Sequence, residues 1–368
     1  MNILILNWRD TKNPKSGGAE LVTLEHAKAW VKKGHKVTWF TSEFEGSKKE
    51  EKIDSVNIIR RGNYLTVFFY APFFYLFSRN EFDLVIDEIH GIPFFTPLYV
   101  RKPKIAFIHE VADEIWDYMY PFPFNKIGKI LERLIFVFYK NVKFMTASNS
   151  TKAVLKKFGI KEKNITVIIS GLSDKPINKL PIKEKLPTFI FVSRVVKMKG
   201  IEEVVKAYFH ILRSVKDANL WIVGNGEKKY VNSLKKMMES YSISTKVKFF
   251  GHVSNDKKLE LMRKSQLLLH ASVKEGWGLV VIEAASQGTP SVVYNVAGLK
   301  DSVVNDKTGI VISKNIPSEL GERAMELLEN KKKYYIFQKN GIQRAKSLKW
   351  EKSVSQSLVL IEKTANNE

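Results

Sequence analysis

The chain has 368 residues, which is longer than one hydrophobic core usually grows, so two domains are expected. Its hydrophobic fraction of 44% is typical of a globular protein, and the absence of cysteine excludes disulfides, thiolate metal sites and a cysteine nucleophile. The net charge of +22 favours an anionic partner, which can be nucleic acid, anionic lipid or a phosphorylated ligand.

The chain begins MNILILNWRD, without the basic region or the long apolar run of a secretory signal. We therefore expect a buried strand there and a cytoplasmic protein. The longest apolar stretch, 64–77, contains Pro72 and is shorter than the roughly 18 residues that cross a bilayer, so no membrane span is expected.

Short apolar strands alternate with amphipathic helical stretches along the first half of the chain, which is typical of a parallel sheet with crossover helices. A helix is predicted from Ala19 to Lys33, because it is amphipathic and followed by Gly34. Six strands are predicted, at 3–6, 36–42, 83–87, 104–109, 143–148 and 165–170.

Segment 174–187 interrupts this alternation, and its three prolines and many lysines predict a linker. Six more strands are predicted after it, at 188–193, 218–224, 247–251, 266–272, 290–295 and 309–313. The pattern therefore predicts two tandem doubly wound, Rossmann-like α/β domains, 1–173 and 188–349. We expect the remaining segment, 350–368, to form a helix that packs back on the first domain.

Ligands of such sheets bind beyond the carboxyl ends of the strands. After the first strand, Gly17 and Gly18 stand directly before a helix, where backbone amides and the helix dipole favour an anion or a sugar oxygen. A flexible turn is the alternative. Neither G-x-G-x-x-G nor G-x-x-x-x-G-K-[ST] is present, which argues against nicotinamide and P-loop nucleotide sites.

Two further strand ends carry charged side chains. Arg194 and Lys199 follow the strand 188–193, and a rigid guanidinium fork beside a flexible ammonium suits a pyrophosphate. Glu275 and Glu283 flank the start of a helix predicted near Leu279, where the helix dipole keeps a carboxylate ionised and able to accept hydrogen bonds from a diol. Such residues are common on any surface, so their position at strand ends is what favours a functional role.

The combination of S-R-x-x-x-x-K-G at 193–200, the E-x7-E pair at 275–283 and the Gly-Gly pair after the first strand resembles the retaining glycosyltransferases of family 4, which have the GT-B fold. The resemblance covers Met1 to about Glu362. It implies that Arg194 and Lys199 bind the donor pyrophosphate, that Glu275 contacts the donor sugar, and that Glu283 contacts the ribose.

The same resemblance implies further donor contacts. It assigns the phosphate cradle to Gly276, Trp277, Gly278 and Leu279. His109, at the end of the strand 104–109, corresponds to a family histidine near the donor sugar, so His109 and Glu275 are the expected catalytic residues. We expect His252 and Val253 to line the base pocket. Segment 297–301 (AGLKD) departs from the family, which commonly has Gly-Gly at its start.

The resemblance implies transfer of a hexose, such as glucose, from a nucleotide diphosphate sugar, such as a UDP-sugar, with retained configuration. The acceptor is expected to be a saccharide or lipid-linked oligosaccharide, in protein N-glycosylation or cell-surface polysaccharide assembly. No D-x-D site is evident, so neither a metal nor another cofactor is expected. The alternatives are a nucleotide-sugar epimerase or hydrolase on the same fold, or a basic nucleic-acid-binding protein. No nucleic-acid-binding module is evident, so nucleic acid is not expected as a partner.

Segment 121–140 combines apolar residues at helical spacing with lysines and an arginine on the opposite side. Such a helix can lie on an anionic membrane, or it can be a crossover helix whose apolar stripe packs on the sheet. Together with the aromatic-rich 64–77, it favours peripheral membrane contact at the inner face of the membrane.

Overall fold

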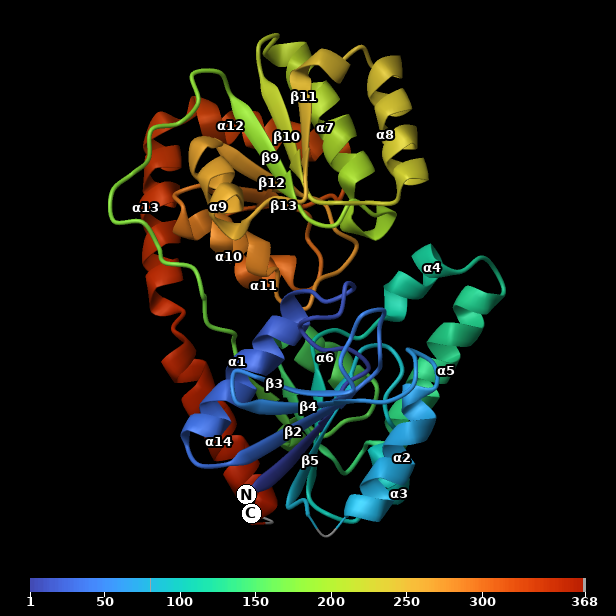
Figure 1. Ribbon diagram of the computed structural model, residues 1–368. Helices are drawn as coiled ribbons and strands as arrows, with labels where there is room; N and C mark the ends of the chain where they lie inside the picture. Colours follow the sequence, from blue (N-terminus) through green and yellow to red (C-terminus); the bar gives the residue numbers. More distant parts are fainter. Residues whose placement is uncertain (80, 367–368) are drawn as a thin grey trace. The chain divides into compact units, whose positions relative to one another are not determined.

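The computed structural model describes residues 1–79 and 81–366 and divides into two compact units. Unit 1 contains residues 1–116 and 120–171 and the segment from Lys349 onward, and unit 2 contains 117–119 and 172–348. Each unit has its own sheet with helices on its faces (Figure 1). The expectation of two Rossmann-like α/β domains is confirmed. Among the described residues, no helix combines the length and apolar character needed to cross a membrane.

The sheet of unit 1 has the strand order β3-β4-β2-β1-β5-β6-β7-β8, and only β3 and β4 pair antiparallel. Its four central strands, β2, β1, β5 and β6, are mostly apolar and almost fully buried, as expected for strands covered on both faces, and β5 also carries the buried carboxylates Asp87 and Glu88. The strands are β1 (Asn2–Leu6), β2 (Lys36–Thr41), β3 (Glu50–Ile53), β4 (Val56–Arg60), β5 (Leu84–Ile89), β6 (Lys104–Ile108), β7 (Lys143–Thr146) and β8 (Ile165–Val167).

The helices of the N-terminal segments are α1 (Gly18–Lys32), α2 (Val67–Ser78), α3 (Thr96–Tyr99), α4 (Trp116–Met119), α5 (Phe124–Phe138) and α6 (Asn149–Lys157). The last helix of the chain, α14 (Trp350–Ala365), also belongs to unit 1 and lies beside α1 (Figure 1). The Ser357 hydroxyl joins the two helices, because it is 2.9 Å from His26 Nδ1 and accepts a hydrogen bond from Trp30 Nε1 at 3.0 Å. The C-terminal helix is therefore part of the core of this unit.

The hairpin β3–β4 was not expected from the sequence. Its turn, Asp54-Ser55, has positive φ at both residues, 47° and 69°, which is the geometry of a tight two-residue hairpin turn. Asn-Gly or Asp-Gly is the usual signal for this turn, and β3 is a charged strand at the edge of the sheet. Neither apolar alternation nor a typical turn pair therefore marked the hairpin.

Most apolar side chains of helix α5 are exposed. Only Gly128, Glu132 and Phe136 are buried on this helix. The Glu132 carboxylate faces inward, where it accepts the amides of Ala112 and Asp113 at 2.7 Å. The interpretation in which the apolar stripe packs on the sheet is therefore wrong. The exposed apolar residues of α5 are Phe124, Ile127, Ile130, Leu131, Leu134, Val137 and Phe138.

The sheet of unit 2 is parallel throughout and has the order β11-β10-β9-β12-β13-β14. Its strands are β9 (Thr188–Val192), β10 (Asn219–Val223), β11 (Val247–Gly251), β12 (Leu267–His270), β13 (Ser291–Val293) and β14 (Gly309–Val311). The helices are α7 (Ile201–Ser214), α8 (Lys228–Ser240), α9 (Asn255–Lys264), α10 (Leu279–Ser286), α11 (Leu299–Ser302), α12 (Pro317–Glu329) and α13 (Lys331–Ser347).

The stretch expected to be a linker, 174–187, belongs to unit 2 and is fastened to it. Its backbone donates from Ile177 N to Ser286 O at 3.0 Å and from Glu184 N to Lys264 O at 2.9 Å. Lys183 is partly buried, and its ammonium donates to Ser265 O and Thr289 Oγ1 at 2.7 and 2.8 Å. The prolines therefore mark an irregular segment that covers this domain.

Candidate active site

In each sheet the strand order reverses at one position, and the predicted site residues lie near that position. In unit 1 the chain builds outward from β1 through β2, and β5 then joins the other side of β1. In unit 2 it builds outward from β9 through β10, and β12 joins the other side of β9. The carboxyl ends at such a switch point form the usual ligand crevice of an open α/β sheet.

In unit 2, Lys199 and Glu275 meet at the switch point. Lys199 lies in a short 3₁₀ helix after β9, η3 (Lys197–Lys199), and its ammonium donates to Glu275 Oε1 at 2.7 Å. The two side chains are only 13% and 15% exposed. His270, the last residue of β12, brings its Nε2 to 3.1 Å from the same oxygen. Lys199 and Glu275, which the sequence assigned separately to the pyrophosphate and to the sugar, are therefore bonded to each other.

This arrangement keeps Glu275 ionised. Burial raises the pKa of the Glu275 carboxyl, but the charge of Lys199 and the hydrogen bond from His270 outweigh burial and hold the pKa well below its usual value. An ionised carboxylate accepts hydrogen bonds and does not donate them. Glu275 can therefore receive hydroxyl groups of a ligand. His270 was not singled out in the sequence.

A glycine makes the contact between the two strand ends possible. Gly200, directly after Lys199, has φ +72°, and a Cβ atom there would lie 1.9 Å from the carbonyl oxygen of Ala271. Only glycine adopts this conformation and tolerates this approach without strain. In this Lys-Gly pair the lysine supplies a positive charge, and the glycine lets the loop lie close to the backbone after β12.

Helix α10 begins beside Glu275. Gly278 occupies the position before its first residue, with φ +74°, and no side chain among the described residues caps this end. The Val281 amide donates to Gly278 O at 3.0 Å, and the first two amides of the helix, at Leu279 and Val280, have no backbone partner among the described residues and are left for an anion. Trp277 is buried at 6% exposure, and its indole Nε1 lacks a hydrogen-bond partner in the described part of the chain.

Glu283, in the second turn of α10, is held by a residue that the sequence did not indicate. Lys258 of α9 places its ammonium 2.8 Å from Glu283 Oε2, and both side chains are about one-fifth exposed, at 20% and 19%. Burial raises the pKa of the Glu283 carboxyl, and Lys258 opposes this shift only in part. Lys258 is not part of any sequence motif, so its pairing with Glu283 becomes visible only in the packing of α9 against α10.

The other predicted residues of unit 2 are not joined to this group by a bond. The Arg194 side chain is exposed and makes no ion pair within the described ranges. His252 is exposed and Val253 packs in the apolar cluster behind β10 and β12. Both follow β11, at the edge of the sheet. Their assignment to a base pocket stays a prediction.

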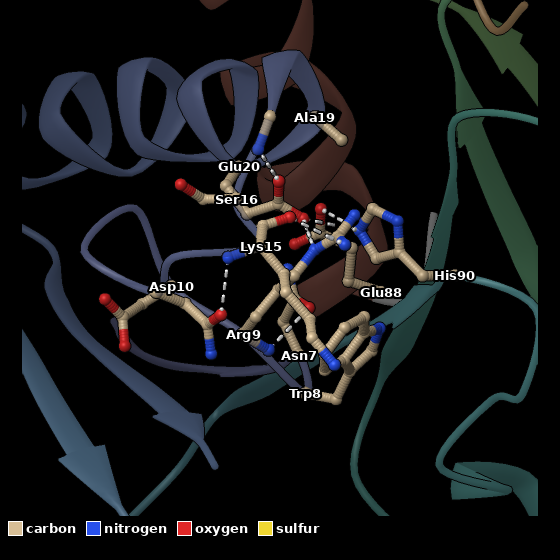
Figure 2. Close-up of polar contacts among 12 residues, drawn as sticks. Asn7, Trp8, Arg9, Asp10, Lys15, Ser16, Ala19, Glu20, Glu88 and His90 are labelled. Atoms are coloured by element: carbon tan, nitrogen blue, oxygen red, sulfur yellow. Dashed lines mark hydrogen bonds and ion pairs between the residues drawn. The ribbon is translucent and has the colours of Figure 1, made fainter. Parts of the chain in front are cut away.

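In unit 1, Gly17 and Gly18 begin helix α1, and a buried carboxylate supports them. Glu20 Oε2 accepts the Gly17 amide at 2.6 Å, and Glu20 Oε1 accepts Arg9 Nε at 2.5 Å. Figure 2 shows Arg9, Glu20, Glu88 and His90 converging there. The Gly17 amide is therefore bonded to Glu20, which leaves the exposed backbone around Gly18 as the part open to a ligand.

His109 follows β6 and lies at the adjacent strand end. Its Nε2 is 3.1 Å from Glu88 Oε1, and His90 Nε2 is also 3.1 Å from that oxygen. Neither Glu88 nor His90 was singled out in the sequence, although the His90 spacing from the end of β5 would place it on the same edge. Among the described residues these three side chains are the one group whose ligand atoms, within 4.8 Å of one another, fit the spacing of a metal site.

Comparison with known proteins identifies the family of the chain. Residues 16–174 match the family model Glycosyltransferase Family 4, and residues 172–344 match Glycosyl transferases group 1. An uncharacterized glycosyltransferase of Methanocaldococcus jannaschii is 26% identical over 328 residues, which cover 83% of this chain and 81% of that protein.

Two solved structures share the fold over the whole chain. Sucrose-phosphate synthase of Thermosynechococcus elongatus has a TM-score of 0.81 at 18% identity and covers 100% of both chains. HepE of Anabaena, solved with UDP-glucose, has a TM-score of 0.74 at 18% identity and covers 98% of this chain and 99% of that one. The resemblance expected from the motifs is confirmed, and the chain belongs to the family 4 glycosyltransferases with the GT-B fold.

Proposed function

We propose that this glycosyltransferase transfers a hexose, with retained configuration, from a nucleoside diphosphate sugar to a saccharide or lipid-linked acceptor. The observation that carries the proposal is the group formed by Lys199, Glu275 and His270 at the switch point of unit 2. It places a cation, an ionised carboxylate and an open helix end side by side. A diphosphate attached to a sugar has matching chemistry, because it combines anionic oxygens with hydroxyls.

Each residue has a chemical task in this proposal. Arg194 and Lys199 bind the diphosphate, and the amides at the start of α10 add donors for the charge that develops on the leaving phosphate. Glu275 accepts sugar hydroxyls, and Glu283, supported by Lys258, accepts the ribose diol. His109 contacts the sugar that is transferred. These cationic and dipolar groups supply the stabilisation that a metal would provide, so we propose that the transfer does not depend on a metal.

UDP-glucose is the donor to test first, because HepE of Anabaena, a protein of the same fold, was solved with it. We expect a nucleotide sugar to raise the apparent melting temperature, since binding to the folded state alone stabilises it. A thermal-shift screen of UDP-, GDP- and ADP-sugars, each repeated with EDTA, tests donor and metal together. Stabilisation by none of them would contradict the proposal, and dependence on a divalent ion would remove the metal-independent part.

An exposed apolar and basic surface supports a lipid-linked acceptor. On α2, Phe69, Phe73 and Phe77 recur at four-residue spacing and are 72%, 62% and 89% exposed. The exposed stripe of α5 adds an apolar face flanked by Lys126, Lys129, Arg133 and Lys140. Patches of this kind mark binding sites, and cations beside aromatics suit an anionic lipid surface.

Sedimentation with lipid vesicles tests this surface. We expect the protein to bind vesicles that contain phosphatidylserine more tightly than neutral phosphatidylcholine vesicles, and to release in high salt, since attraction between exposed charges is screened. Equal and weak binding to both kinds of vesicle would leave a soluble saccharide as the acceptor.

A further inference from the structure

One buried carboxylate oxygen in unit 1 contacts two imidazoles. Glu88 is fully buried at the end of β5, and its Oε1 lies 3.1 Å from both His109 Nε2 and His90 Nε2. The Thr23 hydroxyl of α1 donates to the same oxygen at 2.6 Å. The two rings stack, with centroids 5.4 Å apart and an interplanar angle of 23°. Three donors from three elements therefore converge on one acceptor atom.

The sheet itself produces this convergence. Strands β5 and β6 are parallel neighbours, with Glu88 opposite Phe107 and Ile89 opposite Ile108. Residues two apart on a strand point to the same face, so Glu88 and His90 share a face, and His109 emerges from the neighbouring strand at the same level. Glu88 thus lies within β5, and His90 and His109 come directly after two paired strands, β5 and β6, whose register brings them to the same edge of the sheet.

The carboxylate determines which imidazole nitrogen is bound. Donors surround the Glu88 Oε1 atom, since the Thr23 hydroxyl donates to it and both imidazole Nε2 atoms lie within hydrogen-bond distance, and hydrogen bonds to the charged form keep a carboxyl ionised. An ionised carboxylate only accepts hydrogen bonds, so Nε2 of His109 must carry a hydrogen. Nδ1 of His109 has no hydrogen-bond partner in the described part of the chain, and is the nitrogen left for another group.

We propose that Glu88 is a positioning residue, which holds His109 through Nε2 so that Nδ1 is presented to the substrate. This inference rests on the proposed role of His109 in sugar transfer. A carboxylate that orients an imidazole and fixes its tautomer is a recurrent device in enzymes. His90 shares the carboxylate, and the other charged or titratable groups facing the cluster are Glu20, Arg9 and His26.

A graded series at position 88, with a matched control, tests the inference. Glu88→Gln keeps an acceptor oxygen but removes the charge, and Glu88→Leu removes both. Asp87→Asn is the control, because Asp87 is an equally buried carboxylate on the opposite face of β5 that bonds Thr96 and Tyr139 and touches no histidine. We expect kcat to fall roughly 10- to 100-fold in Glu88→Leu and less in Glu88→Gln, with the donor KM little changed, since a charge-assisted bond is lost.

A spectroscopic measurement separates this inference from the proposed function. In protein labelled with ¹⁵N-histidine, we expect His109, assigned by its loss in His109→Gln, to keep its hydrogen on Nε2 in the wild type and in Asp87→Asn. In Glu88→Leu the two tautomers should mix. An unchanged His109 signal in Glu88→Leu, or equal loss of kcat in Asp87→Asn, would overturn the inference. A wild type without nucleotide-sugar turnover would instead contradict the proposed function, and the tautomer result would still stand.

Discussion

The bond between Lys199 and Glu275 makes a prediction about nucleotide affinity. Their atoms are 2.7 Å apart and both side chains are mostly buried. A hydrogen bond between charged groups contributes about 1.5–3 kcal/mol. In the proposed site Lys199 breaks its bond to Glu275 when it binds the diphosphate, so the energy of that bond opposes nucleotide binding in the wild type. A variant without the Glu275 charge does not have to break this bond.

We therefore expect opposite effects on UDP. Glu275→Gln should bind UDP more tightly, by up to roughly 10-fold, whereas Lys199→Met should bind it roughly 10- to 100-fold more weakly, at about 1.4 kcal/mol per decade. UDP-glucose should show a different order, because Glu275→Gln also loses its contact with the sugar. The glucose moiety increases the affinity by the ratio of the dissociation constant for UDP to that for UDP-glucose. We expect this ratio to be smaller in Glu275→Gln than in the wild type.

Isothermal titration calorimetry with UDP and UDP-glucose measures both constants. Lys197→Met is the matched control, since Lys197 is an exposed lysine of the same 3₁₀ turn, and we expect it to change the affinity little. Thermal melts of each variant show whether it is folded. If Glu275→Gln and Lys199→Met weaken UDP binding equally, or if Lys199→Met behaves like Lys197→Met, the reasoning is refuted.

Three further outcomes are expected. Gly200→Ala places a Cβ atom 1.9 Å from the Ala271 carbonyl oxygen in a left-handed conformation, so chemical denaturation should show a loss of at least about 1–2 kcal/mol and calorimetry a weaker affinity for UDP; wild-type values for both would contradict the role given to this glycine. Burial lowers the pKa of His26 to about 3, so the unfolded chain takes up a proton below pH 6.5 that the folded chain does not, and stability should fall by about 2 kcal/mol between pH 7 and pH 5. His26→Gln should reduce that fall in urea unfolding, and an identical pH dependence would refute the assignment. The double variant Phe73→Ser/Phe77→Ser should lose vesicle binding and keep the wild-type affinity for UDP, because both side chains are exposed on α2. If the variant still sediments with vesicles, these residues do not form the membrane-binding surface.

The strands of both sheets could be predicted well because buried parallel strands are continuous apolar runs, as in β1 and β9. The hairpin β3–β4 was missed because β3 is a short charged strand at the edge of the sheet and its turn, Asp54-Ser55, is not a usual hairpin pair. Helix α5 shows the opposite limit. Its apolar spacing predicts a helix correctly, but spacing alone does not reveal whether the apolar face points to the sheet or to the surroundings.

The site shows the same division. Lys199 and Glu275 could be found because a motif and a strand end mark them, and the structure brings them together. Lys258 and Glu88 could not, because each acts on a partner through tertiary packing or strand register. His270 stands at a strand end, as His109 does, but no motif marks it and only the structure brings it to Glu275. The bond between Lys199 and Glu275 was also unforeseen, since each residue was assigned to the ligand and not to the other.

Retaining transfer from a nucleotide sugar is the central claim, and the anomer of the first product tests it most directly. Slow hydrolysis of UDP-α-glucose, with water as acceptor, needs no knowledge of the natural acceptor. Proton NMR, recorded before mutarotation, distinguishes the two anomers of the released glucose. The account predicts UDP release with α-glucose as the first sugar, at a rate that falls in Lys199→Met. First appearance of β-glucose would contradict retention, and UDP release unaffected by Lys199→Met would contradict the site.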